Sequence, residues 1–168
     1  EHIQKKILVS IGDPLVRFEE DPVRCLRAIR FSSKLKFKIS NDIKEAIYKK
    51  GNLLENISNA RMFDEFCKIF LTKEAQNNFN KLNTFGVLKY LINTENHPKN
   101  SFDSRFQQAA LVNTDNRLKA SKSVTPGFLI AALLWPRLIK AAKEKGSLNL
   151  RKFFRNMDRI IREQQELT

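Results

Sequence analysis

The chain has 168 residues, of which 31 are lysine or arginine and 18 are aspartate or glutamate, so its formal net charge is +13. A surplus of this size predicts a polyanionic partner, with nucleic acid as the first choice and a basic surface without such a partner as the alternative. Hydrophobic residues make up 42%, and only 5 glycines and 5 prolines occur, which argues against collagen-like, disordered and all-β chains. The length suits one domain or two small domains packed together.

The cysteines and the apolar runs give no sign of a zinc site or a transmembrane helix. Cys25 and Cys67 are far apart and form no Cys-x-x-Cys pair, so we interpret them as core thiols in a reducing, cytoplasmic compartment. The longest apolar run, residues 128–135, is well short of the ~20 residues that span a bilayer. We expect no metal site, no membrane partner and a monomeric chain. Because no signal peptide is visible and the first residue is not methionine, we expect a piece of a longer protein.

The first segments in chain order are short. Residues 7–9 are apolar and fit either the end of a helix or a short strand, and residues 12–14 (Gly-Asp-Pro) predict a turn. Residues 15–19 are interpreted as a short connector.

An arginine-rich helix is predicted next. Asp21 followed by Pro22 indicates its start, because aspartate accepts hydrogen bonds from free backbone amides and proline suits the first turn. Arg24, Arg27 and Arg30 step along one side of this helix. Apolar residues cover so much of the remaining circumference that we expect packing on more than one side.

Two further helices follow. Ser40 predicts the cap of a helix that stops before Gly51, and Ser58 caps a helix through about residue 71. The second of these carries a clean apolar stripe at steps of three and four residues.

Two short helical segments, residues 73–82 and 87–92, are predicted to be hinged near Gly86. The polar, Asn-rich residues 93–100 are the best candidate for a domain boundary.

The C-terminal part predicts three helical segments. A helix resumes at residues 102–112, and Thr125 followed by Pro126 starts another that is apolar all round and therefore central in its domain. Pro136 is expected to kink or end it. Residues 150–161 form a basic amphipathic helix, whose basic side is expected to meet RNA phosphates or solvent rather than a membrane.

The neighbouring side chains of Asp21 and Arg24 have a chemical use in nucleotide recognition. A carboxylate only accepts hydrogen bonds and a guanidinium only donates them. Held side by side, they complement a base edge that offers an amino donor beside a ring nitrogen, as adenine and cytosine both do. Judged from spacing alone, a helix cap with an i,i+3 ion pair is the more common role of such a pair.

Several motifs resemble the class II nucleotidyltransferases, which comprise the bacterial poly(A) polymerases and the CCA-adding tRNA nucleotidyltransferases. The resemblance is dense over about 30 residues: Ile-Gly-Asp-Pro at 11–14, Glu-Asp-Pro-Val-Arg at 20–24 and Leu-Arg-Ala-Ile-Arg-Phe at 26–31. Residues 113–117 and the Thr-Pro-x-Phe-Leu segment from Thr125 look more like the poly(A) polymerases than the CCA-adding enzymes.

The resemblance implies an all-α chain in which a helical neck domain (residues 1–95) precedes a helical body domain (residues 96–168) that is incomplete at its end. The mixed α/β catalytic head is expected to be absent. Asp21 and Arg24 would read the incoming base, with Glu20 in support and Arg27 beside them in the arginine band.

Other residues are assigned supporting roles by the same resemblance. Arg61 and Glu65 would brace the neck helices, although with Lys68 they also fit an intrahelical ion-pair ladder. Candidate RNA-binding residues lie in the body: Arg117, Arg151, Arg155 and Arg159.

The sequence lacks the carboxylates that nucleotidyl transfer requires. Family members hold two Mg²⁺ ions through an Asp-x-Asp motif after a Gly-rich turn, and this chain has neither. Mg²⁺ and ATP are therefore expected in the complete enzyme, and the segment alone is expected to be inactive.

The function that these patterns favour is the nucleotide-selecting and RNA-binding part of a polymerase that adds AMP from ATP to RNA 3′ ends. One alternative is the same portion of a CCA-adding enzyme, because adenine and cytosine share the edge in question. The other is a non-enzymatic helical RNA-binding module.

Overall fold

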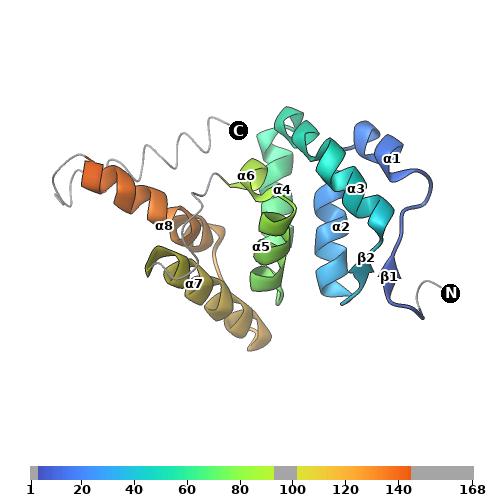
Figure 1. The fold of residues 1–168 in the computed structure, drawn as a ribbon. Helices are drawn as coiled ribbons and strands as arrows, with labels where there is room; N and C mark the ends of the chain where they lie inside the picture. Colours follow the sequence, from blue (N-terminus) through green and yellow to red (C-terminus); the bar gives the residue numbers. More distant parts are fainter. Residues whose placement is uncertain (1–3, 93–101, 145–168) are drawn as a thin grey trace.

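The computed structural model describes residues 4–92 and 102–144, and this part of the chain is built almost entirely of helices (Figure 1). It confirms the all-α prediction. In chain order the elements are β1 (Ile7–Leu8), α1 (Pro14–Glu20), α2 (Val23–Lys34), β2 (Lys38–Ile39), α3 (Asn41–Lys50), a 3₁₀ helix (Gly51–Asn56), α4 (Asn59–Phe70), α5 (Ala75–Thr84), α6 (Leu88–Leu91), α7 (Phe102–Lys119) and α8 (Pro126–Glu144).

Helix α2 lies at the centre of the N-terminal part and contacts α1, α4, α5 and β2. Its residues Cys25, Leu26 and Ile29 are fully buried. The prediction that this helix is packed on more than one side is confirmed.

The segment before α1 contributes one strand to a minimal parallel sheet, and the segment after α2 contributes the other. Strands β1 and β2 pair with Ile7 opposite Lys38 and Leu8 opposite Ile39. Of the two interpretations of residues 7–9, the short strand is therefore correct.

Helix α1 corrects the prediction of a connector at residues 15–19. Asp13 accepts a hydrogen bond from the backbone N–H of Leu15 at 2.9 Å, and Pro14 occupies the first helical turn, so this Asp-Pro pair begins a helix. The similar pair at Asp21 and Pro22 does not act in the same way. Helix α2 begins at Val23 without a side-chain cap, because the Asp21 carboxylate contacts another helix instead.

The next predicted helices are confirmed. Helix α3 follows Ser40 and stops before Gly51, and α4 follows Ser58 and ends at Phe70. Helices α5 and α6 are separated by a turn at Gly86, whose φ of +71° is the left-handed conformation that glycine adopts most readily.

Helices α7 and α8 form an antiparallel pair beside α5 (Figure 1). As predicted, α8 begins with Thr125 and Pro126, and the Thr125 hydroxyl accepts from the Phe128 N–H at 3.4 Å. Pro136 does not end the helix, which continues to Glu144. One turn before this proline, the carbonyl of Leu133 accepts a hydrogen bond from the buried side chain of Gln107 at 2.7 Å.

One hydrophobic core runs through the described residues. It joins the buried side chains of α2 to α6 with Leu111 of α7 and with Leu129 and Leu133 of α8. The expected boundary at residues 93–100 lies outside the described residues, and the division into neck and body remains a prediction. In the part of the chain that the structure describes, no helix is long and apolar enough to cross a membrane.

Candidate nucleotide-selecting site

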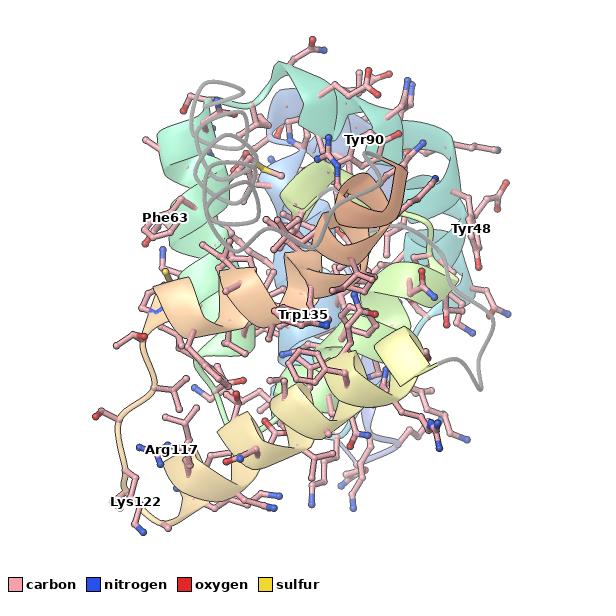
Figure 2. All side chains as sticks on the ribbon, turned by 90° about the vertical axis from the view of Figure 1, so that its left-hand side faces the viewer. Tyr48, Phe63, Tyr90, Arg117, Lys122 and Trp135 are labelled. Carbon is pink, nitrogen blue, oxygen red and sulfur yellow. The ribbon has the colours of Figure 1, made fainter. Side chains whose placement is uncertain are left out.

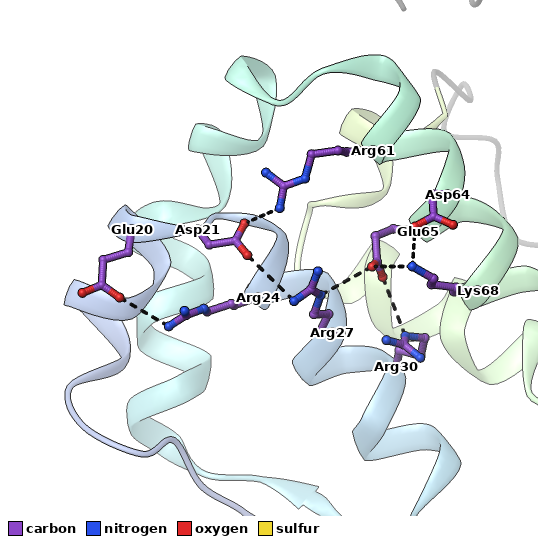
Figure 3. Close-up of polar contacts among 9 residues, drawn as sticks. All are labelled: Glu20, Asp21, Arg24, Arg27, Arg30, Arg61, Asp64, Glu65 and Lys68. Carbon is purple, nitrogen blue, oxygen red and sulfur yellow. Dashed lines mark hydrogen bonds and ion pairs between the residues drawn. The ribbon is translucent and has the colours of Figure 1, made fainter.

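Charged residues from α1, α2 and α4 meet along the side of α2 that faces α4 (Figure 3). The end of α1 supplies Glu20, the turn after it supplies Asp21, and α2 and α4 supply the rest. The α2 contributions share the 3.6-residue period of one helix face, and the α4 contributions are spaced by four and three residues. They are Arg24, Arg27, Arg30, Arg61, Glu65 and Lys68.

The Asp21 carboxylate is oriented by two arginines from different helices. Arg61 donates from Nη2 to Oδ1 at 2.9 Å, and Nη1 of Arg27 lies 3.9 Å from Oδ2. The Asp21 side chain is 20% exposed, so its carboxylate is held but not enclosed. The first of these contacts spans 40 residues of sequence, which is why the spacing around Asp21 did not reveal it.

Arg24 pairs with Glu20, which corrects the expectation of an i,i+3 ion pair with Asp21. Its Nη1 lies 3.4 Å from Glu20 Oε2, and the same oxygen accepts from Arg17 Nη1 at 3.1 Å. Arg17 was not singled out by the sequence analysis, although its position three residues before Glu20 was a usable signal. The Arg24 side chain is 40% exposed and keeps donors beyond those that face Glu20.

Glu65 is the buried member of the cluster, at 2% exposure. Nε of Arg27 lies 3.4 Å from Oε1, Nε of Arg30 lies 3.7 Å from Oε2, and Nζ of Lys68 lies 3.6 Å from Oε1. Three cations therefore offset the cost of burying one carboxylate.

These contacts differ from the intrahelical ion-pair ladder that was the alternative for α4. Arg61 reaches out to Asp21, and Glu65 is bridged to two arginines of α2. Lys68 alone follows the ladder pattern, with contacts to both Asp64 and Glu65. Arg27 links the two carboxylates, because it contacts both Asp21 and Glu65.

The arrangement places an oriented acceptor near exposed donors. Each carboxylate oxygen has two lone-pair sites, and Oδ2 of Asp21 is touched by Arg27 alone, at the long distance of 3.9 Å, among the described contacts. The chemistry available is therefore recognition of a planar group that carries both a donor and an acceptor. Within residues 4–92 and 102–144, no three His, Cys, Asp or Glu side chains are grouped to hold a metal ion.

The predicted RNA-binding residues fall in two places. Arg117 lies at the end of α7, where its Nε and Nη2 donate to the carbonyl of Ser123 at 3.3 and 3.1 Å and so hold the loop that leads to α8 (Figure 2). Arg151, Arg155 and Arg159 lie outside the described residues.

Comparisons with known proteins find one matching family model and several enzymes of similar sequence. The family described as "Probable RNA and SrmB- binding site of polymerase A" matches residues 36–96. Poly(A) polymerase I of Salmonella typhi is 33% identical over 148 residues, which are 86% of this chain and 32% of that protein. Poly(A) polymerase I of Haemophilus influenzae is 34% identical over 83% of the chain and 32% of its own length.

A CCA-adding enzyme of Anoxybacillus flavithermus is 42% identical, but over 42% of the chain and 18% of its own length. The sequence of the chain is similar to both the bacterial poly(A) polymerases and the CCA-adding enzymes. Its likeness to the poly(A) polymerases extends further along the sequence. The chain spans about a third of the length of the poly(A) polymerases that it matches.

Proposed function

We propose that this chain is the nucleotide-selecting and RNA-binding part of a polynucleotide adenylyltransferase that adds AMP from ATP to RNA 3′ ends. The observation that supports this most is the oriented Asp21 carboxylate beside the exposed Arg24, in a chain that is similar to poly(A) polymerase I over 86% of its length.

Recognition of adenine would use one oxygen and one guanidinium. Asp21 Oδ2 would accept from the N6 amino group, and Arg24 would donate to N1, after release of part of its contact with Glu20. Arg61 and Arg27 hold Asp21 in one orientation, so little side-chain entropy is lost when the base binds. A good two-point contact of this kind discriminates against a wrong base by about 1–3 kcal/mol.

RNA binding rests on the matched family's description and on charge. The formal net charge of +13 favours binding to the phosphate backbone, which is not specific for sequence and weakens with added salt. Arg117 is the predicted RNA-binding residue that lies within the described part of the chain.

The complete protein would supply the rest of the reaction. Its head domain would hold Mg²⁺ and the ATP phosphates, and this segment alone would be inactive. We propose a monomer in the cytoplasm, where free thiols such as Cys25 and Cys67 persist.

The experiment compares two arginines that contact the same oxygen of Glu20. In the complete gene product, Arg24→Ala should lower kcat/KM for ATP by about 5- to 150-fold and erase the preference for ATP over CTP. Arg17→Ala removes an equivalent contact to Glu20 and should leave that preference unchanged. An unaltered ATP-to-CTP ratio in Arg24→Ala would exclude the base-reading role.

A CCA-adding enzyme is the second candidate, favoured by the 42% identity over 71 residues to one such enzyme. Incubating the complete protein with tRNA that lacks its CCA end separates the two, because CTP incorporation would identify the second activity. The non-enzymatic module is the remaining alternative, and an upstream Gly-rich turn with Asp-x-Asp would exclude it.

A further inference from the structure

Four lysines gather at the end of α2 that is opposite to the Asp21 site. We call them the lysine patch: Lys6, Lys34, Lys36 and Lys38. Lys34 ends α2, Lys36 lies in the turn that follows, and Lys38 begins β2. The backbone N–H of Lys38 donates to the carbonyl of Lys6 at 2.8 Å, which brings the two segments together. Figure 1 shows β1 and β2 beside the lower end of α2.

All four side chains are exposed, and within the described residues none forms an ion pair with a carboxylate. Four like charges therefore repel one another, and no carboxylate in the described part of the chain neutralises them.

Two of the lysines occupy backbone conformations that disfavour side chains. Lys6 has a φ of 52° and Lys36 a φ of 56°, and they are two of the three non-glycine residues with positive φ among those described. Lys36 N–H donates to Ser33 O at 3.2 Å and Phe37 N–H donates to Ser32 O at 2.9 Å. This is the hydrogen-bond pattern of a helix end at which glycine is the usual residue.

A structural role at the end of α2 does not account for all four lysines of the lysine patch. Cations at a helix C-terminus interact favourably with its dipole, which explains Lys34 and in part Lys36. It does not explain Lys6, which lies in the turn before β1, or Lys38, which begins β2. Lysine in two left-handed positions, where glycine would form the same turns with less strain, indicates that the charge itself is retained for a ligand.

We propose that the lysine patch binds the phosphate backbone of the RNA substrate at a distance from its reacting 3′ end. This inference rests on the proposed function and names a contact surface for it. Helix α2 has 12 residues, and at 1.5 Å per residue it separates the patch from the Asp21 site by about 18 Å. RNA would therefore contact one end of α2 through its backbone, while the incoming base is read at the other end.

The decisive variant is Lys36→Gly in the complete gene product, because it removes a charge and relieves the left-handed strain together. Stability should rise, with an unfolding midpoint higher by about 2–4 °C. Affinity for an oligo(A) of about 12 nucleotides should fall roughly fivefold at 0.1 M salt, and the slope of log K against log salt should shrink by about 0.7. Lys36→Arg should bind like the unmodified protein.

Control variants show whether the loss of oligo(A) affinity depends on the lysine patch or follows the removal of any exposed lysine. Lys73→Gln removes an exposed lysine between α4 and α5, and it should leave oligo(A) affinity unchanged. Lys6→Gln with Lys38→Gln should lose about 25-fold at the same salt, as expected for two phosphate contacts.

Three results would overturn the proposal. The first is a stabilised Lys36→Gly protein with unaltered RNA affinity and salt slope. The second is an equal loss in Lys73→Gln. The third is weaker binding to vesicles of anionic phospholipid with RNA binding intact, which would assign the patch to a membrane surface. The preference for ATP over CTP is measured in the Lys6, Lys36, Lys38 and Lys73 variants and should not change. Failure of the patch is thereby distinguished from failure of the proposed function, which would appear as no RNA binding or no use of ATP in the unmodified protein.

Discussion

The α2–α4 contact and the α5–α7 contact each bury a carboxylate, but they neutralise it in different ways. Glu65 on α4 is surrounded by side-chain cations, and one of these, Arg27, extends to Asp21 at the surface. Asp115 on α7, at 7% exposure, accepts from the backbone N–H groups of Ala75 at 2.7 Å and Gln76 at 3.3 Å.

The two carboxylates differ in the groups that neutralise them, which are backbone N–H groups for Asp115 and side-chain cations for Glu65. Asp115 caps the first turn of α5, which has no side-chain cap of its own, and its hydrogen bonds end in the backbone of that helix. Glu65 holds cationic side chains, and one of them, Arg27, also contacts Asp21. The first arrangement fixes two helices to each other, whereas the second also fixes the geometry of a site.

The largest expected effect comes from Glu65→Ala. It leaves Arg27 and Arg30 without the buried carboxylate that offsets their charge, so the free energy of unfolding should fall by about 3 kcal/mol. Urea unfolding measures this, with Asp64→Ala as the control, because Asp64 contacts Lys68 from an exposed position on the same helix. A loss no larger than that of Asp64→Ala would contradict the account.

Asp115→Ala should cost about 2 kcal/mol, because two amides at the start of α5 lose their acceptor. Asp115→Asn keeps one acceptor oxygen and should recover about half of the loss. In contrast to Glu65→Ala, the Asp115 variants should leave the ATP-to-CTP ratio unaltered. A changed ratio would show that the two contacts are not as separate as described.

The burial of Cys25 in α2 should make the stability of the protein depend on pH. Burial raises the pKa of its thiol to about 12 from 9.0. A raised pKa contributes stability that is complete below pH 9.0 and is lost as the pH rises toward 12. At pH 10 the free energy of unfolding is lower by about 1 kcal/mol because of this thiol. Between pH 7 and pH 10 it should therefore fall less in Cys25→Ala than in the unmodified protein. Cys67→Ala, at a less buried thiol, is the control, and an equally reduced fall in both variants would argue against this explanation.

The smallest change in stability is expected for Arg61→Ala, at about 0.5 kcal/mol, because the Arg61 side chain is 50% exposed. Its effect on nucleotide choice should be larger than its effect on stability, since Asp21 loses the partner that orients it. Arg61→Ala should therefore change the ATP-to-CTP ratio clearly while it changes the midpoint of thermal unfolding only slightly. Proportional losses in both would indicate that Arg61 acts through folding alone.

The sequence by itself determined most of the helices, the central position of α2 and the family. Helices α3 and α4 were predictable because caps and apolar periodicity act within a few residues of the chain. The residues of the candidate site were proposed from the resemblance of residues 20–24 to a known motif and from the spacing of charges on α4.

The partners of these residues were decided by the tertiary structure. Asp21 and Asp13 both precede proline, yet Asp13 caps its own helix and Asp21 contacts Arg61, 40 residues further along. Asp115 likewise caps a helix 40 residues before it. A local pattern sets which groups are available, but a carboxylate pairs with the donors that packing brings nearest. That choice depends on the contact between helices, which neighbouring residues in the sequence do not encode.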